Sequence, residues 1–426
     1  MTERLPGFST LSIHAGAQPD PTTGARATPI YQTTSFVFND ADHAASLFGL
    51  QAFGNIYTRI GNPTNAVLEE RVAALEGGTA ALAVASGHAA QLVTFHALLQ
   101  PGDEFIAARR LYGGSINQFN HSFKNFGWNV VWADTDDVST FEKALSPKTK
   151  AIFIESIANP GGTVTDIEAI AAIARKAGVP LIVDNTLASP YLIKPIDHGA
   201  DIVLHSATKF LGGHGNSIGG IIVDAGTFDW SRDGRYPVLS EPRPEYHGIK
   251  LQETFGNFAF AIAARVIGLR DLGPALSPFN AFLLLTGIET LSLRVQRHSD
   301  NAKAVAEWLS AHPAVAWVSY AGLPGDRYHN LARKYSPKGA GAVFTFGLKG
   351  GYDAGINLVS NVKLFSHLAN VGDTRSLIIH PASTTHSQLS DAQKALAGAG
   401  VDVVRLSVGL EDKEDLIADL DQALKA

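Results

Sequence analysis

The sequence predicts an α/β protein in which a mostly parallel β-sheet is sandwiched by helices and is followed by a smaller α+β domain. Two observations lead to this prediction. Between about residues 64 and 225, short apolar runs alternate with segments whose apolar residues recur at helical spacing. Strands separated by helices pair in parallel, and the helices then cover both faces of the sheet. After about residue 257 the pattern changes to long helices and alternating strands, which indicates a second domain.

The chain divides into three expected parts. Residues 1–60 are rich in turn-forming and polar residues, so we expect an N-terminal arm that contacts a neighbouring subunit. Residues 61–256 are expected to form the large domain. Its last part, 225–256, is dense in Pro, Gly and charge, which is typical of a long insertion loop. Residues 257–426 are expected to form the smaller C-terminal domain.

The predicted elements follow one another closely along the chain. In the large domain they are helices over 65–75, 89–99 and 166–177, and strands over 80–85, 104–107, 151–155, 181–184, 202–204 and 220–223. In the smaller domain, helices are predicted between 282 and 311 and over 412–426, and Pro313 ends the first helical region. Strands over 342–346 and 403–408 alternate in polarity, which predicts one solvent-facing side.

Composition limits the partners and the chemistry. The net charge of the 426 residues is −6 and no basic block occurs, so we expect neither nucleic acid nor a membrane as a partner. The absence of cysteine excludes disulfides, thiolate catalysis and zinc–cysteine sites, and the 15 histidines show no metal-ligand spacing, so no metal is expected. No secretory signal is apparent at the N-terminus, and no apolar run reaches the ~20 residues of a membrane helix; we expect a cytoplasmic protein.

Lys209 and Asp184 give the strongest chemical indication. Each follows or ends a short apolar strand, and the carboxyl ends of parallel strands form the ligand-binding edge of such a sheet. An amine that forms a Schiff base and a carboxylate that keeps a pyridine nitrogen protonated are the two groups that pyridoxal 5′-phosphate (PLP) requires. The alternatives are a solvated surface lysine and a helix-capping aspartate. Pro190 and Pro195 argue against a helix that starts directly after Asp184.

Several other segments have polar groups that suit a phosphate. Ser86-Gly-His lies between a predicted strand and a predicted helix, where unpaired N–H groups and the helix dipole attract an anion; an ordinary strand–helix turn is the alternative. Ser206 and Thr208 place hydroxyl groups beside Lys209. Tyr57 and Arg59, two residues apart in an extended segment, point the same way and could hold a phosphate.

Two further residues have open interpretations. Tyr112 could present an aromatic face to a flat cofactor ring, and a packing tyrosine at a turn is an equally good interpretation. Arg405, in an alternating strand, is either a solvated charge or an anchor for a carboxylate.

Eight segments occur in one order along nearly the whole chain. They are Tyr57-Thr-Arg-Ile-Gly-Asn-Pro-Thr, Ala85-Ser-Gly-His, Leu111-Tyr-Gly-Gly, Glu155-Ser-Ile-Ala-Asn-Pro, Val183-Asp-Asn-Thr, Ser206-Ala-Thr-Lys-Phe, His380-Pro-Ala-Ser-Thr-Thr-His and Arg405-Leu-Ser-Val-Gly-Leu-Glu. Together they resemble the Cys/Met-metabolism family of PLP-dependent enzymes, whose fold is the type I, aspartate-aminotransferase-like fold. The number and order of the segments make a chance match improbable.

The resemblance implies roles for individual residues. Lys209 would be the Schiff-base lysine, Asp184 the partner of the pyridine nitrogen and Tyr112 the ring that stacks on the cofactor; these three form the implied catalytic set. Arg405 would bind the substrate α-carboxylate. The implied cofactor-binding set is Tyr57, Arg59, Ser86, Gly87, His88, Tyr112, Asn159, Asp184, Ser206, Thr208 and Lys209, and the implied substrate-binding set is Arg405, Asn370, Asn159 and Tyr57. His88 departs from relatives that often carry Met or Gln, which matters little if only its N–H is used.

The resemblance also implies an activity. In the implied reaction, sulfide or a thiol such as methanethiol replaces the acetate of O-acetyl-L-homoserine and gives homocysteine or methionine. Gly114, Asn370, Gln388 and the 225–256 insertion favour this substrate. Family members that cleave methionine, form cystathionine or use O-succinylhomoserine share the cofactor residues, so these three activities stay open as alternatives. In the family, Tyr57 and Arg59 reach the neighbouring subunit's cofactor, which implies a homotetramer built from dimers with active sites at the subunit interface.

Overall fold

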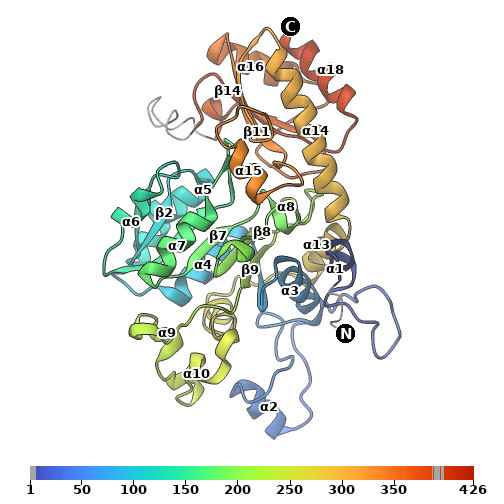
Figure 1. Ribbon diagram of the computed structural model, residues 1–426. Coiled ribbons are helices and arrows are strands. Elements are labelled where there is room, and N and C mark those ends of the chain that lie inside the picture. The colour runs from blue at the N-terminus through green and yellow to red at the C-terminus, as the bar shows by residue number, and fades with distance from the viewer. Residues whose placement is uncertain (1–5, 386, 388–393, 395–397) are drawn as a thin grey trace, which may run out of the picture.

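The computed structural model describes residues 6–385, 387, 394 and 398–426 (Figure 1). Its larger sheet consists of β1 (Ala80–Val84), β9 (Gly220–Asp224), β8 (Ile202–Ser206), β7 (Leu181–Asp184), β4 (Thr149–Glu155), β2 (Glu104–Ala108) and β3 (Asn129–Ala133), in that order. The strands from β8 to β3 pair in parallel, whereas β9 runs antiparallel between β1 and β8. The predicted mostly parallel sheet is therefore confirmed. The edge strand β3 was not predicted, although Val130, Val131, Trp132 and Ala133 form a short apolar run.

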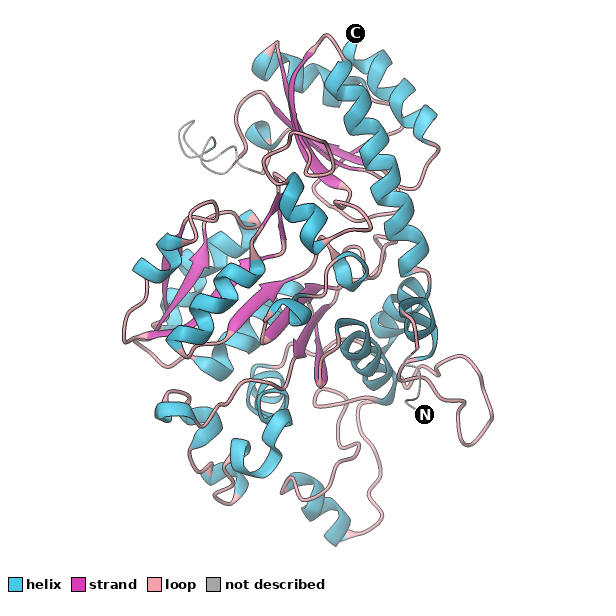
Figure 2. Ribbon diagram, viewed as in Figure 1, coloured by secondary structure: helices cyan, strands magenta, loops and turns pink. Residues whose placement is uncertain are grey.

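Helices lie on both faces of this sheet (Figure 2). They include α3 (Pro63–Glu76), α4 (Gly87–Leu98) and α7 (Ile167–Ala177). Each starts at a residue whose side chain accepts an N–H of the first turn, namely Asn62, Ser86 and Asp166. The helices α3 and α7 end at Gly77 and Gly178, whose φ angles of 81° and 67° are left-handed and favour glycine. The sequence thus fixes where these helices begin and end.

The core of the large domain lies between the sheet and these helices. The apolar side chains of β4, β7 and β8 are almost completely buried, as parallel strands with both faces covered require. Between α4 and β2, the rings of Phe95 and Phe105 have centroids 4.3 Å apart. This packing holds the carboxyl ends of the central strands in fixed positions. None of the described helices is both long and apolar enough to cross a membrane.

A second sheet lies in the C-terminal part of the chain. It contains β10 (Val315–Ser319), β11 (Val343–Leu348), β14 (Val403–Ser407), β13 (Leu377–Ile379) and β12 (Ser366–His367), in that order, with α14 (Leu291–Ala311), α16 (Gly351–Asn361) and α18 (Lys413–Leu424) packed beside it. The prediction of a solvent-facing side for β11 and β14 is wrong, since every residue of both strands is buried. The polar side of β14 faces the large domain, where Arg405 contacts Asn159.

The segment 225–289 forms a packed layer. It contains α9 (Pro237–Ser240), α10 (Leu251–Phe255), α11 (Ala259–Ala263), a helical turn over Ala264–Leu269, α12 (Arg270–Leu272) and α13 (Pro278–Glu289). Trp230 and Tyr236 are buried within it, and α13 packs against α3 of the large domain. The expected insertion loop thus contains short helices. The expected boundary at 257 precedes helices that belong with the larger sheet, and the second sheet and its helices begin with α14.

The N-terminal segment has an anchored start and an extended remainder. The helix α1 (Phe8–His14) packs against α3, α13 and α14. Beyond it the chain leaves the body of the molecule and returns through α2 (Ala41–Phe48), which projects away from the sheets (Figure 1). Val37 and Phe53 in this part are 97% and 75% exposed. Such exposure of large apolar side chains is typical of a surface that another chain covers.

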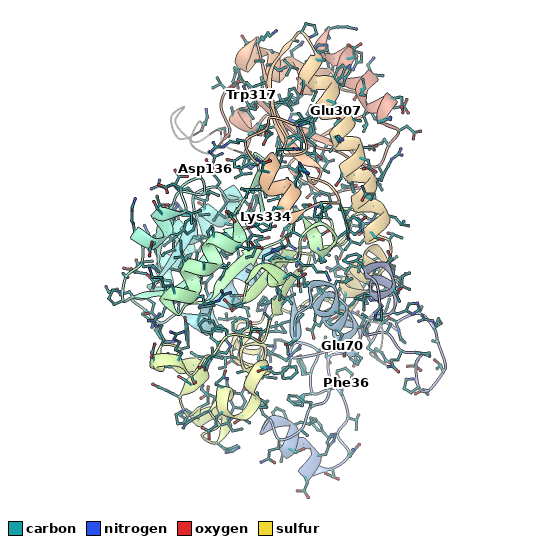
Figure 3. The ribbon with its side chains drawn as sticks, viewed as in Figure 1. Phe36, Glu70, Asp136, Glu307, Trp317 and Lys334 are labelled. Carbon is teal, nitrogen blue, oxygen red and sulfur yellow. The ribbon has the colours of Figure 1, made fainter. Side chains whose placement is uncertain are left out.

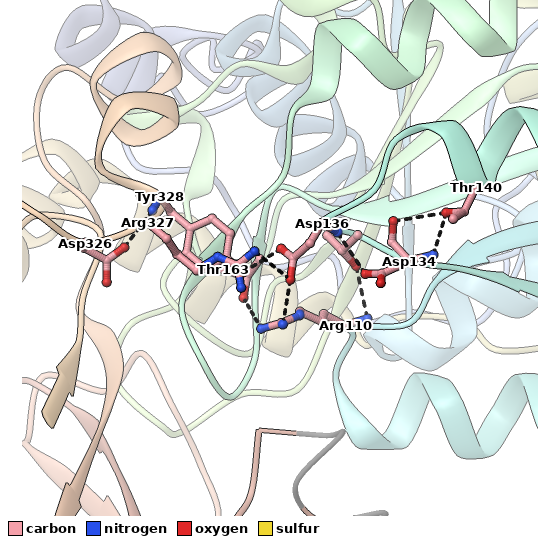
Figure 4. Close-up of polar contacts among 9 residues, drawn as sticks. Arg110, Asp134, Asp136, Thr140, Thr163, Asp326, Arg327 and Tyr328 are labelled. Atoms are coloured by element: carbon pink, nitrogen blue, oxygen red, sulfur yellow. Dashed lines mark hydrogen bonds and ion pairs between the residues drawn. The ribbon is translucent and has the colours of Figure 1, made fainter. Parts of the chain in front are cut away.

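An ion cluster around Asp136 joins the two sheet domains (Figure 4). The Asp136 carboxylate accepts hydrogen bonds from Arg110 at 2.7 Å and from the hydroxyl of Tyr328 at 2.7 Å, and it lies 3.1 Å from the Arg327 guanidinium. Arg110 belongs to the large domain, whereas the other two residues precede α15 (His329–Tyr335) of the second domain. Nearby, Lys334 of α15 forms an ion pair with Glu168 of α7 at 2.8 Å; Figure 3 labels Asp136 and Lys334 in the whole molecule.

We expect Asp136→Ala to loosen this boundary between the domains. The substitution removes the shared acceptor of three donors and should cost about 1–2 kcal/mol of local stability. Hydrogen–deuterium exchange should therefore increase in residues 326–335 and stay unchanged in β7 and β8. Asp137→Ala is the matched control, since the Asp137 side chain bonds only within its own loop, to Ser139. Equal exchange in the two variants would contradict a role of Asp136 in joining the domains.

Candidate active site

A cavity of about 290 Å³ lies at the carboxyl ends of the central strands, between the large domain and the second sheet. Its lining residues come from the end of β4, the end of β7, the start of α4, the segment after β8, and β14. They are Ser86, Gly87, His88, Gln91, Tyr112, Ser115, Glu155, Ile157, Asn159, Asp184, Thr186, Leu187, Ser206, Thr208, Lys209, Ile218, Ala369, Asn370, Val371, Thr385 and Arg405. The structure thus brings together every predicted site residue except Tyr57 and Arg59, at the edge that parallel sheets use for ligands.

Lys209 lies three residues after the end of β8 and points into the cavity. Its backbone N–H donates to the carbonyl of Ser206 at 3.2 Å, and its Nζ donates to Oδ1 of Asn370. Burial lowers the pKa of the Lys209 amine, and the positive charge of Arg405 lowers it further. A lowered pKa favours the neutral amine, which is the form that acts as a nucleophile or a base.

Arg294 of α14 holds the backbone that follows Lys209. The Arg294 guanidinium is buried and donates to the carbonyl oxygens of Phe210 at 2.9 Å and Leu211 at 3.1 Å. Its burial lowers its pKa to about 10, so it stays cationic at neutral pH. These bonds satisfy backbone acceptors in a glycine-rich segment that has no ladder of its own. They fix the backbone next to Lys209 and so restrict the position from which its side chain extends.

Asp184 ends β7 beneath the same cavity. Its Oδ1 accepts the backbone N–H of Thr186 at 3.0 Å, and the Thr186 hydroxyl in turn accepts the N–H of Ser206 at 2.8 Å. Burial raises the pKa of the Asp184 carboxyl. A carboxylate in such a dry position is stabilised when a cation pairs with it. A protonated ring nitrogen would be such a cation.

The first turn of α4 and the segment after β8 form one end of the cavity. The N–H groups of Gly87 and His88 lie in that first turn, where helical acceptors are lacking, while the Ser86 hydroxyl accepts the N–H of Ala89 at 3.1 Å. A Cβ on Gly87 would come within 2.9 Å of the Cβ of Ser206, so glycine permits the close approach of these two segments.

Tyr112, Asn159 and Arg405 also line the cavity. The Tyr112 ring is 48% exposed and has its centroid 5.9 Å from that of His88. Arg405 donates to Oδ1 of Asn159 at 3.0 Å and to the carbonyl of Asn370 at 3.1 Å. Its Nε is buried and has no hydrogen-bond partner among the described residues. Burial lowers the pKa of Arg405 to about 10. A buried cation with an unused donor is suited to an anionic ligand group.

Tyr57 and Arg59 lie outside the cavity of their own chain. Tyr57 is 41% exposed, and Arg59 lies over its ring at 5.6 Å and donates to the carbonyl of Arg270. Their predicted roles in binding cofactor and substrate therefore stay predictions. Gln388 lies outside the described residues.

Sequence reasoning missed five polar residues of the cavity: Gln91, Ser115, Glu155, Thr186 and Thr385. The Gln91 amide donates to the Ser115 hydroxyl at 2.9 Å. Glu155 is the only one with a usable signal, because it ends a predicted strand as Asp184 does. The other four lie within a helix or a turn, where residue type alone does not indicate a site.

The residues of the cavity fit PLP. A buried carboxylate can pair with the ring nitrogen, an amine of lowered pKa can take the aldehyde, and N–H and hydroxyl groups at a helix start can hold the phosphate. Together with the sheet order, this donor set defines a PLP-dependent enzyme of the type I fold.

The comparison with known proteins gives the family. The model of the Cys/Met metabolism PLP-dependent enzymes matches residues 9–425, and the chain belongs to this family. It is 52% identical to an O-acetyl-L-homoserine sulfhydrylase of Leptospira meyeri, over 98% of this chain and 96% of that protein. It is 54% identical to O-acetyl-L-homoserine sulfhydrylase 1 of Thermus thermophilus, over 98% and 99%.

A solved structure agrees with the fold. The protein, from Campylobacter jejuni, is described as an O-acetylhomoserine (thiol)-lyase and contains N′-pyridoxyl-lysine-5′-monophosphate. It superposes with a TM-score of 0.96 at 41% identity, over 99% of this chain and all of that one. The predicted family, the type I fold and the PLP cofactor are confirmed.

Proposed function

We propose that this enzyme catalyses γ-replacement, in which sulfide displaces the acetate of O-acetyl-L-homoserine and L-homocysteine forms. A thiol such as methanethiol in place of sulfide would give methionine. The observation that carries the proposal is the arrangement of Lys209, Asp184 and Arg405 around one cavity. Relatives that match 98% of the chain and are named for this reaction support the choice of substrate.

Each group in the cavity has a proposed task. When bound, PLP supplies an electron-poor ring that stabilises negative charge at the substrate Cα. Lys209 removes the proton from Cα and then a proton from Cβ, which allows acetate to leave from Cγ, and it returns protons after sulfide has added. Arg405 binds the α-carboxylate through the donor that no described residue uses. Asp184 holds the ring nitrogen in its protonated form.

The remaining contacts would orient the cofactor. Tyr112 would stack on the ring, and Asn159, which orients Arg405, would contact the ring oxygen. The N–H groups of Gly87 and His88 hold the phosphate. Ser86, Ser206 and Thr208 complete the phosphate site with their hydroxyl groups, and Asn370 orients both Lys209 and Arg405.

A comparison of donors tests the activity. Purified enzyme is incubated with sulfide and either O-acetyl-L-homoserine or O-succinyl-L-homoserine, and with methionine alone. We expect homocysteine and acetate from the first mixture at a rate well above the others. Faster release of methanethiol from methionine would assign a methionine γ-lyase, and a preference for the succinyl donor would assign the related sulfhydrylase. Efficient use of cysteine as the acceptor would assign a cystathionine γ-synthase.

We further propose a homotetramer built from dimers, located in the cytoplasm, in which the arm of one subunit completes the site of another. Two observations support the shared site. Tyr57 and Arg59 lie beside each other but outside their own cavity. The arm that leads to them exposes Val37 and Phe53 almost as fully as an unfolded chain does.

Mixing two inactive variants tests this arrangement. Arg59→Ala and Lys209→Ala are each expected to lose activity. After dissociation and reassociation of a mixture, half of the dimers contain both variants, and in each of these one site has an intact Lys209 and an intact Arg59. About a quarter of the wild-type activity should therefore return. No recovery, despite mixed dimers shown by mass spectrometry, would mean that Arg59 serves its own chain.

A further inference from the structure

Glu155 is a buried carboxyl group in the cavity to which the proposed reaction assigns no task. It ends β4 and lies opposite Asp184 of β7 in the parallel register. Both side chains line the cavity, and Glu155 is 5% exposed. A buried acid without a partner is costly, so the contacts of Glu155 need an explanation.

Both oxygens of Glu155 accept backbone N–H groups of site residues. Oε1 accepts from Tyr112 at 2.7 Å, and Oε2 accepts from Asn159 at 3.1 Å. The backbone of Glu155 is itself fixed, because its carbonyl accepts the Thr165 hydroxyl at 2.6 Å. Tyr112 and Asn159 are 47 residues apart in the chain and lie in irregular segments. The carboxyl group therefore joins two loops that no strand pairing aligns.

These two bonds reach the groups that face the ligands. Tyr112 carries the exposed ring at the cavity wall, and the Asn159 side chain accepts from Arg405 at 3.0 Å. A shift of the Asn159 backbone would move the acceptor that orients the Arg405 guanidinium. A shift of the Tyr112 backbone would move the ring. Positional errors of this kind weaken binding even when every side chain is intact.

We infer that Glu155 is a positioning residue that sets the placement of the Tyr112 ring and of the Asn159–Arg405 pair relative to Asp184. The inference rests on the proposed roles of Tyr112 and Arg405. Burial raises the pKa of the Glu155 carboxyl well above its usual range, and the charge of Asp184 raises it further. The two N–H groups that Glu155 accepts act in the opposite direction and lower its pKa.

Glu155→Gln tests this inference. Glutamine has the shape of a protonated glutamate and the same charge, but its amide oxygen can accept only one of the two N–H groups, and its NH₂ faces the other donor. PLP is titrated into the full-length enzyme after removal of the cofactor, and the dissociation constant is measured by absorbance. We expect this constant to rise about tenfold. KM for O-acetyl-L-homoserine should rise similarly, with a smaller change in kcat.

Asp201→Asn is the matched control. Asp201 is a largely buried acid of the same sheet that accepts the Leu181 N–H at 2.8 Å, but it lies at the amino end of β8, away from the cavity. Its variant should keep the PLP dissociation constant and KM of the wild type. Values for Glu155→Gln within twofold of the wild type would overturn the inference. Equal losses in both variants would also overturn it, since they would indicate a general effect on folding.

A measurement on the wild type covers the case in which Glu155→Gln does not fold. The Tyr112 and Asn159 amides should exchange with deuterium slowly, as expected of buried bonds to a carboxyl group; fast exchange would overturn the inference. Wild-type turnover separates this inference from the proposed function. A wild type that binds PLP but does not use O-acetyl-L-homoserine would refute the substrate, whereas the PLP titration would still report on Glu155.

Discussion

Lys209→Ala is expected to lower kcat with O-acetyl-L-homoserine and sulfide by about 10⁴-fold or more. In the proposed reaction this one amine moves the protons at Cα and Cβ and also holds the cofactor covalently. Burial and the charge of Arg405 lower the pKa of this amine, which favours its neutral form. Steady-state kinetics of the purified variant give the effect, and the visible absorbance of the lysine-bound cofactor should disappear at the same time.

Lys150→Ala is the appropriate control for this experiment. Lys150 is a mostly buried lysine on β4 of the same sheet, and its amine donates to the carbonyl of Arg235 at 2.9 Å, far from the cavity. Its loss should leave the absorbance and kcat unchanged. A Lys209→Ala enzyme that keeps the wild-type absorbance band and full turnover would refute the assignment of the catalytic lysine.

Asp184→Asn is expected to lower kcat by about 10²–10³-fold and to raise KM far less. Asparagine keeps the size of the side chain and can still accept the Thr186 N–H, so the fold should persist. The lost charge matters most when negative charge develops on the substrate, because the ring is then no longer kept protonated. Interactions of that kind affect kcat more than KM.

The pH dependence provides a second measurement on Asp184. Because burial raises the pKa of its carboxyl group, acid pH protonates it more readily than an exposed aspartate, and PLP affinity should fall as pH decreases. This dependence should be weaker in Asp184→Asn. Asp224→Asn is the control. Asp224 is a buried acid at the end of β9 that lies away from the cavity, so this variant should keep the wild-type kcat. An Asp184→Asn enzyme with the wild-type kcat would contradict the proposed pairing of Asp184 with the ring nitrogen of the cofactor.

The sequence was sufficient for the central features of the fold. Short apolar runs with capped helices between them located β1, β2, β4, β7, β8 and β9, and strand ends pointed to Lys209 and Asp184. The polarity pattern was misleading for β11 and β14, because every residue of both strands is buried and Arg405 of β14 contacts the large domain rather than solvent. A pattern along one strand carries no information about what covers it.

The parts of the site that the sequence could not supply depend on contacts between distant segments. Glu155 was visible only as the last residue of a predicted strand and the first residue of a motif, since its partners are the backbone N–H groups of Tyr112 and Asn159 and leave no trace in residue type. Arg294 likewise lies in a helix whose other residues predict only packing. The spacing of Tyr57 and Arg59 indicated a phosphate site, but only the resemblance assigned them to another subunit's site, and their partner surface belongs to that subunit in the proposed assembly.

The location of Arg405 has a consequence for how substrate preference can change. The residue lies in the middle of β14, paired on both sides by β11 and β13, so its backbone cannot move without disrupting a sheet. The walls around it come from less constrained segments, such as those of Ile218 and Ala369. Evolution or engineering can therefore vary the acyl group and the thiol through these walls, while the recognition of an amino acid remains fixed.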